Sequence, residues 1–212
     1  MRNEYVYESK KVGKYIVKVV QDTDPSNPRT EWDNLCTMVC FHRRYNLGDM
    51  NHGFTPDSIR EYLSENKKTV FWKPLYLYDH GGITISTGTF ACAWDSGLVG
   101  YIFIERDRFL KEFGFKRMSK KAKERLEGLL DGEVEDYDNY LTGEVYGYMV
   151  EDEEGDIVDS CWGYNGDSKY ALEEGVYAAQ AQIRYDIREH VKKVKTWIRN
   201  RVPLDKREPL KV

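Results

Sequence analysis

The sequence predicts an α+β fold with a largely antiparallel sheet of about six to eight strands, a few short helices and a long C-terminal helix. Two observations lead to this class. Strand-like segments follow one another in the first half of the chain without a regular alternation of strand and helix. The chain then ends in apolar residues that recur at steps of three and four over residues 168–199. We expect a single domain over residues 1–200 and a flexible tail over 201–212.

The N-terminal half is predicted to supply most of the strands. The segments "EYVYES" and "KYIVKVVQD" flank Gly13, which can supply the positive φ of a hairpin turn. "LCTMVCFHR" is a third strand, and Thr55 or Asp57 can cap a short helix that has Pro56 in its first turn. Three further strands are expected in "TVFWKPLYLYD", "ITISTG" and "LVGYIFIE", with Pro74 marking an edge strand or a bulge.

The helical period dominates from residue 106 onward. "RDRFLKEFG" is expected to end at Gly114, Ser119 to cap a helix through "KKAKERLEGLLDG", and "EVEDYDNYLTG" to form a separate short helix that ends at Gly143. A hairpin follows with its turn at "EEGD". The last helix would be roughly 48 Å long. It therefore either crosses the sheet with a loose end or projects to contact a partner or a second copy of the chain.

Charge is strongly segregated along the chain. The 43 residues from Leu126 to Ser168 contain 14 acids and no Lys or Arg. These runs are either solvated faces that neutralise basic parts of the fold, or an acidic surface that engages a basic host protein. Interleaved aromatic residues would anchor such an interface. The predicted partner-binding residues are Asp136, Tyr137, Tyr140, Tyr146, Tyr148, Glu151, Asp152, Glu153, Glu154, Asp156 and Trp162.

A competing interpretation uses the basic segments. Residues 106–125 contain nine Lys or Arg against three acids, and residues 184–212 contain ten against four. Either segment could lie on phosphates, so direct nucleic-acid binding is the alternative function.

Metal chemistry has two candidate patterns. Asp22, Asp24 and Asp33 occupy positions 1, 3 and 12 of a calcium-loop template, although the flanking segments are strand-like and position 12 lacks Glu. The second pattern is a soft-metal set on one face of an extended strand, namely Cys36, Met38, Cys40 and His42, with His80 or Cys92 as an additional ligand. Alternate residues along a strand are not the usual zinc spacing. We expect a self-bonded turn and a core strand, with no metal and no other cofactor.

The third candidate function is a small hydrolase. "ACAWDSG" supplies Cys92 and Asp95, and "YDHGG" supplies His80, which are the residue types of a thiol nucleophile, its base and an orienting carboxylate. No phosphate loop, dinucleotide fingerprint or His-Glu-x-x-His motif occurs. The sequence favours a binding protein over an enzyme.

Location is predicted from what the chain lacks. No apolar run approaches the roughly 18 residues of a membrane span, and "MRNEYVYESKK" has no apolar signal segment. The four cysteines show no disulfide spacing, which is typical of a reduced compartment. We expect a cytoplasmic protein without a membrane partner.

Several segments carry a resemblance. "TDPSNPRTEWDNLCTMVCFHRRYNLGD", "PLYLYDHGGITIST", "DYDNYLTGEVYGYMVEDEEG" and "DSCWGYNG" resemble an uncharacterised protein family of bacteriophages and mobile elements in gut and clostridial bacteria. Cys36 stands where that family has Gly. The resemblance implies no activity and no catalytic residue. It implies an accessory protein in the cytoplasm of a bacterial host cell, of a kind that acts by binding a host enzyme such as a defence nuclease.

Overall fold

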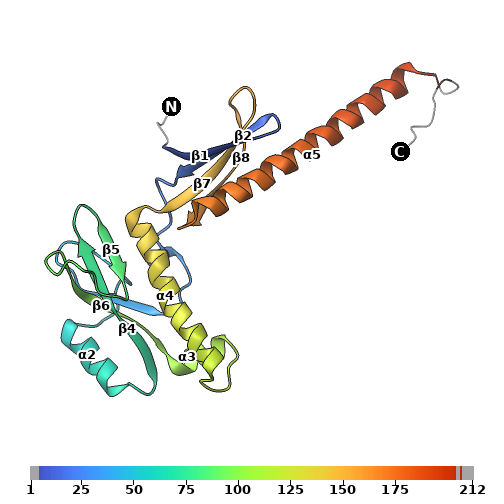
Figure 1. The fold of residues 1–212 in the computed structure, drawn as a ribbon. Helices are drawn as coiled ribbons and strands as arrows, with labels where there is room; N and C mark the ends of the chain where they lie inside the picture. The colour runs from blue at the N-terminus through green and yellow to red at the C-terminus, as the bar shows by residue number, and fades with distance from the viewer. Residues whose placement is uncertain (1–4, 204–205, 207–212) are drawn as a thin grey trace. The chain divides into compact units, whose positions relative to one another are not determined.

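The computed structural model describes residues 5–203 and 206, and this part of the chain forms eight strands and five helices (Figure 1). The predicted α+β class, its antiparallel pairing and its long C-terminal helix are confirmed, with the strands divided between two sheets of four. Where the sequence predicts one domain over residues 1–200, the structure has two compact units. Unit 1 comprises the chain up to Gln21 and from Tyr146 onward, and unit 2 comprises Asp22–Val145.

Unit 1 is a four-stranded sheet with one long helix on it, in the strand order β1-β2-β7-β8. Its elements are β1 (Val6–Val12), β2 (Tyr15–Gln21), β7 (Val145–Glu151), β8 (Ile157–Asn165) and α5 (Ser168–Arg201). Gly13 closes the predicted β1–β2 hairpin with φ +62°. Small residues on α5 bring the helix close to the sheet. A Cβ on Gly175 would lie 2.5 Å from a methyl of Val17, so only glycine fits at this contact.

The two halves of α5 differ in their surroundings. Asp167 caps the helix by accepting a hydrogen bond from the amide of Tyr170 at 2.9 Å, and the buried residues Ala171, Gly175 and Ala179 all lie in the first half. The second half runs past the end of the sheet of unit 1 (Figure 1). Arg201 is the last helical residue, and most of the predicted tail, 204–205 and 207–212, lies outside the described residues. No helix in the described part of the chain has both the length and the apolar character needed to cross a membrane.

Unit 2 has the strand order β3-β6-β4-β5. Its elements are α1 (Pro28–Glu31), β3 (Thr37–Cys40), α2 (Pro56–Glu65), β4 (Val70–Asp79), β5 (Ile83–Ser86), β6 (Ser96–Glu105), α3 (Arg106–Glu112) and α4 (Lys120–Thr142). Thr55 caps α2 in a reciprocal bond pair with Ser58, as expected. Because β5 pairs with β4 only from Tyr76 onward, Pro74 lies on an open stretch, followed by a bulge.

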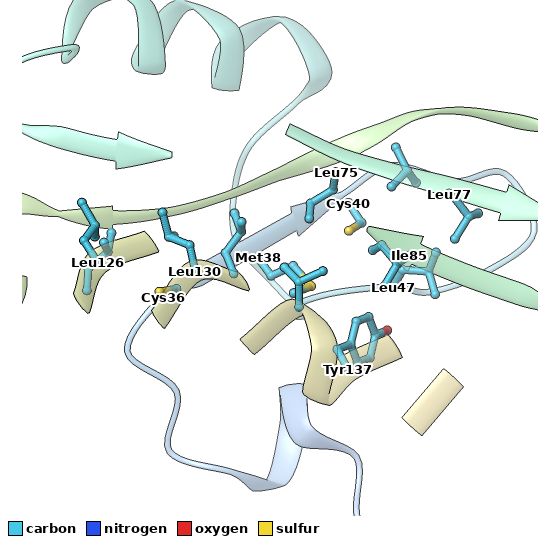
Figure 2. Close-up of a cluster of buried hydrophobic side chains, with 14 of the residues drawn as sticks. Cys36, Met38, Cys40, Leu47, Leu75, Leu77, Ile85, Leu126, Leu130 and Tyr137 are labelled. Atoms are coloured by element: carbon cyan, nitrogen blue, oxygen red, sulfur yellow. The ribbon is translucent and has the colours of Figure 1, made fainter. Parts of the chain in front are cut away.

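Helix α4 corrects one prediction. The two helices expected over residues 119–143 are a single helix of 23 residues, because an apolar stripe of Leu126, Leu130, Val134 and Tyr137 continues through Gly132. A helical glycine costs only about 1 kcal/mol relative to alanine, which this burial outweighs. Figure 2 shows the α4 side chains packed against Met38, Leu75 and neighbouring residues of the sheet.

Candidate functional site

The predicted acidic, tyrosine-rich region is divided between the two units. Asp136, Tyr137 and Tyr140 lie on α4 of unit 2, whereas the residues from Tyr146 to Trp162 lie on β7 and β8 of unit 1.

Three of the predicted aromatic anchors are core residues, and their assignment as partner-binding residues is wrong. Tyr137 is 2% exposed, and its hydroxyl accepts a hydrogen bond from the amide of Gly48 at 3.1 Å. Burial raises the pKa of Tyr137. Tyr146 and Tyr148 are buried against α5. Tyr140 is half-buried and stacks on Tyr137. Only a side chain that reaches solvent can contact a partner, so the buried rings of Tyr137, Tyr146 and Tyr148 stabilise the fold instead.

Several acids of the cation-free window also have structural roles. Glu133 ion-pairs with Arg29 at 2.8 Å, and Glu151 pairs with Lys18 at 2.6 Å. Asp138 accepts a hydrogen bond from the amide of Ile85 at 2.7 Å. The acidic window is thus partly neutralised within each unit, as one of the two interpretations of the charge pattern predicts.

The β7–β8 hairpin remains exposed, and we call its residues 152–162 the acidic hairpin. The amide of Asp152 donates to the carbonyl of Asp156 at 3.0 Å, and the Asp152 carboxylate accepts from the amides of Glu154 and Asp156. These bonds hold Glu153, Glu154 and Asp156 outward. Within the described residues, no ion pair reaches Glu153, Glu154, Asp156 or Asp159.

The strand that follows the turn is exposed along most of its length. β8 is an edge strand, and every residue from Ile157 to Cys161 is exposed. Ile157 is 57% exposed and Trp162 43% exposed. The ring of Trp162 packs over Gly147 of β7, where any Cβ would collide with it. The acidic hairpin therefore joins a negative turn to an apolar, unpaired strand edge.

The candidate hydrolase residues His80, Cys92 and Asp95 lie close together, but their contacts differ from those of a catalytic triad. The Nδ1 atom of His80 lies 3.3 Å from Asp95 Oδ2, and Cys92 Sγ lies 3.6 Å from the same oxygen. A thiol nucleophile needs the imidazole beside the sulfur and the carboxylate behind the imidazole. Here the carboxylate contacts both the imidazole and the thiol. The arrangement does not support nucleophilic catalysis.

The calcium-loop candidates form a different structure. Asp22 accepts a hydrogen bond from the amide of Asp24 at 3.1 Å, and Asn27 caps the single helical turn of α1. Pro28–Glu31 is helical, so the segment leading to Asp33 does not wrap around a central ion. In the described residues no group of three or more His, Cys, Asp or Glu side chains could hold a metal ion. Burial raises the pKa of the Cys40 thiol to about 12, as suits a core residue.

A buried charge network was not predicted from the sequence. The side chain of Arg29 is 1% exposed; it donates to Asp49, to Glu133 and to the carbonyl of Cys36 at 2.7–2.9 Å. Glu133 also accepts from the amides of Leu35 and Cys36, both at 3.0 Å. Burial alone disfavours a charged guanidinium, but the two carboxylates raise the pKa of Arg29. The network fixes the loop before β3 to α4.

Two hollows open beside the loop that joins β3 to α2. One, of about 470 Å³, is lined by His42, Arg43, His52 and their neighbours. The second, of about 350 Å³, shares His42 with the first and is lined by Asp79, Trp94 and residues near them. A volume of 300–1,000 Å³ is typical of small-molecule sites. The sequence pattern of "FHRRYN" predicts the end of a strand and does not predict either hollow.

The second half of α5 is amphipathic and exposes part of its apolar face. Ile187, Val191 and Val194 are exposed at spacings of four and three. Residues 187–201 also carry six Lys or Arg and one acid. The two predicted basic segments belong to different units, since residues 106–125 lie in unit 2.

Comparison of the chain with protein-family models, with curated proteins and with solved structures finds no match in any of the three.

Proposed function

We propose that this chain is a stoichiometric binding protein that engages a basic host macromolecule through the acidic hairpin. The observation that carries the proposal is the exposed edge of β8, which has apolar residues beside a turn of uncompensated acids.

The exposed edge supplies the means of attachment. An edge strand presents unpaired backbone N–H and C=O groups, and proteins usually block it with charges, prolines or a covering element. From Ile157 to Gly163, β8 has one charged residue, Asp159, and no proline. A partner strand that added to this edge would gain backbone hydrogen bonds and would cover Ile157 and Trp162.

The acids supply the selectivity. Exposed charges change the rate of association and exclude wrong partners more than they add affinity. Three acids within the turn favour a partner with a basic surface, such as the groove of a nucleic-acid-processing enzyme. With the resemblance to phage and mobile-element proteins, this supports inhibition of a bacterial defence enzyme in the host cytoplasm as the biological role.

The test compares matched charge reversals in the full chain. Glu153, Glu154 and Asp156 are replaced by Lys, whereas Asp152 is kept because it holds the turn. The control makes three reversals at exposed acids of unit 2. Its residues are Glu61, Glu65 and Glu112.

Affinity capture from host lysate, followed by mass spectrometry, should recover a partner with the wild type and the control but not with the hairpin variant. Recovery of the same partner at the same yield with all three proteins would overturn the proposal. Circular dichroism confirms that each variant is folded.

Nucleic-acid binding through α5 is the second candidate. The six cations on residues 187–201 favour it, because a helix with this charge can lie along phosphates. A gel shift at low salt should then show a complex that weakens as salt is raised and that is lost when Arg188, Lys192 and Lys195 are replaced by Gln. Absence of any complex at low salt would dispose of this candidate.

A further inference from the structure

Two histidines on the β3–α2 loop are fixed in the same tautomer. His42 Nδ1 accepts a hydrogen bond from the amide of Arg44 at 3.3 Å, and His52 Nδ1 accepts one from the amide of Phe54 at 3.1 Å. A ring nitrogen that accepts carries no proton, so in the neutral imidazole Nε2 carries it. Each histidine that lines the larger hollow is therefore a hydrogen-bond donor at Nε2.

Aromatic packing holds both imidazoles in place. The His42 ring stacks on Tyr45 with centroids 4.8 Å apart and an interplanar angle of 7°. The His52 ring meets Phe41 edge-on at 5.5 Å and lies against Phe54 at 6.3 Å. Donors that are already ordered lose little freedom when a ligand binds, so the hollow is organised in advance.

Residues with positive φ angles, among them Gly48 and Asn51, determine the backbone conformation of the β3–α2 loop. Gly48 has φ +73°, and a Cβ there would lie 2.6 Å from the carbonyl oxygen of Met38, so only glycine fits. Asn51 has φ +60°, a conformation that asparagine tolerates better than most residues. Asn51 and Asn46 both line the hollow, and asparagine side chains carry amide donors.

The charge of the larger hollow is positive. Arg43 lines it and forms no ion pair with any described residue. Asp49 is the carboxylate in the lining, but its oxygens are taken by Arg29 and by the amide of Met38. A ligand entering here meets two imidazole donors, a guanidinium and two amides, which together match the several acceptor oxygens of an oxyanion.

The smaller hollow has a different character. Its lining includes the paired Asp79 and Arg44, and Asp95, which contacts His80, so it lacks the unpaired guanidinium of the larger hollow. Trp94 is 98% exposed at its edge and offers a free aromatic face. The ring of a ligand could stack there while donors on that ring meet the carboxylates.

We propose that these adjoining hollows bind a nucleotide, with its phosphate among His42, His52 and Arg43 and its base on Trp94. The ligand is either a free mononucleotide or a nucleotide of a single strand, since both present the same chemistry. The site lies wholly within unit 2, so it does not depend on the acidic hairpin of unit 1.

The test uses the full chain and three probes: inorganic phosphate, a mononucleotide and a short single-stranded oligonucleotide. Imidazole signals are followed by ¹H–¹⁵N correlation, and affinity is measured by calorimetry. Phosphate should shift the signals of His42 and His52, and Arg43→Gln should weaken its binding about tenfold. Arg60→Gln, on the exposed face of α2, is the matched control and should leave binding unchanged.

The mononucleotide should bind about tenfold tighter than phosphate, and Trp94→Ala should remove that advantage without changing phosphate affinity. If the oligonucleotide binds tighter than the mononucleotide, the source is a nucleic-acid strand; if weaker, it is the free nucleotide. The proposal is overturned if millimolar phosphate leaves both imidazole signals unmoved, or if Arg43→Gln and Arg60→Gln behave alike. A hairpin variant that lost its protein partner but still bound phosphate would separate the two proposals.

Discussion

Replacing Arg29 by methionine should destabilise unit 2, because it leaves two carboxylates without their cation. Removing one partner of a buried ion pair costs about 3–5 kcal/mol. The side chain of Glu133 is 11% exposed and that of Asp49 is 24% exposed, and each keeps backbone donors after the change. We therefore expect a loss at the lower end of that range, about 3 kcal/mol of unfolding free energy.

The measurement combines urea unfolding with amide hydrogen exchange. Two compact units need not unfold in one step, so a single unfolding curve can mix their contributions. The amides of Leu35 and Cys36, which donate to Glu133, report this network directly. In Arg29→Met their exchange should quicken by at least 100-fold, since about 3 kcal/mol corresponds to a factor of that size.

A double-mutant cycle supplies the control. Glu133→Gln keeps an oxygen for the two amides but removes the charge that Arg29 faces. Combining it with Arg29→Met should cost at least about 1 kcal/mol less than the sum of the single changes, because the pair interacts. A cost below about 1 kcal/mol for Arg29→Met, with unchanged exchange, would refute the reasoning.

Other predictions concern single positions. Burial raises the pKa of Asp138, so the folded state binds its proton more tightly than the unfolded state does. Its contribution to stability is therefore greatest below the ordinary value of 3.8 and is lost as pH rises through the folded pKa; Asp138→Asn should flatten this part of the pH–stability curve. Gly175→Ala should cost about 1–3 kcal/mol in thermal unfolding, because the new methyl would overlap Val17. Gly132→Ala, whose Cβ meets nothing within 4 Å, should instead stabilise α4 by up to about 1 kcal/mol, and equal effects at the two glycines would contradict this account.

Features that depend on neighbouring residues could be predicted from the sequence. Thr55 and Ser119 cap their helices and Gly143 ends α4 with φ +77°, because each of these bonds closes within a few residues. The boundary expected near Gly132 failed because a weak local preference was outweighed by packing of the whole helix. Local chemistry sets where elements start and stop only when tertiary burial does not oppose it.

The candidate sites depended on information that the sequence does not contain. Arg29 and Glu133 are 104 residues apart, and no spacing rule pairs them. Alternation along β7 indicates that Tyr146 and Tyr148 share a face, but not that α5 covers it. The donors of His42 and His52 become visible only when the hydrogen bonds of the loop are known.

The distribution of charged residues along the sequence predicts only part of the surface charge of the folded protein. A sequence window without Lys or Arg predicts a negative surface only if its acids form no ion pairs in the fold. The partners of such ion pairs can be distant in sequence, as Lys18 is from Glu151. In the described part of unit 1, the turn over residues 152–156 holds four acids, none of which has an ion pair. That narrower surface is easier to test, because three substitutions can reverse it without touching a core contact. The nucleotide hollow lies in the other unit and is lined by different residues, so the effects of hairpin and Arg43 substitutions should be independent.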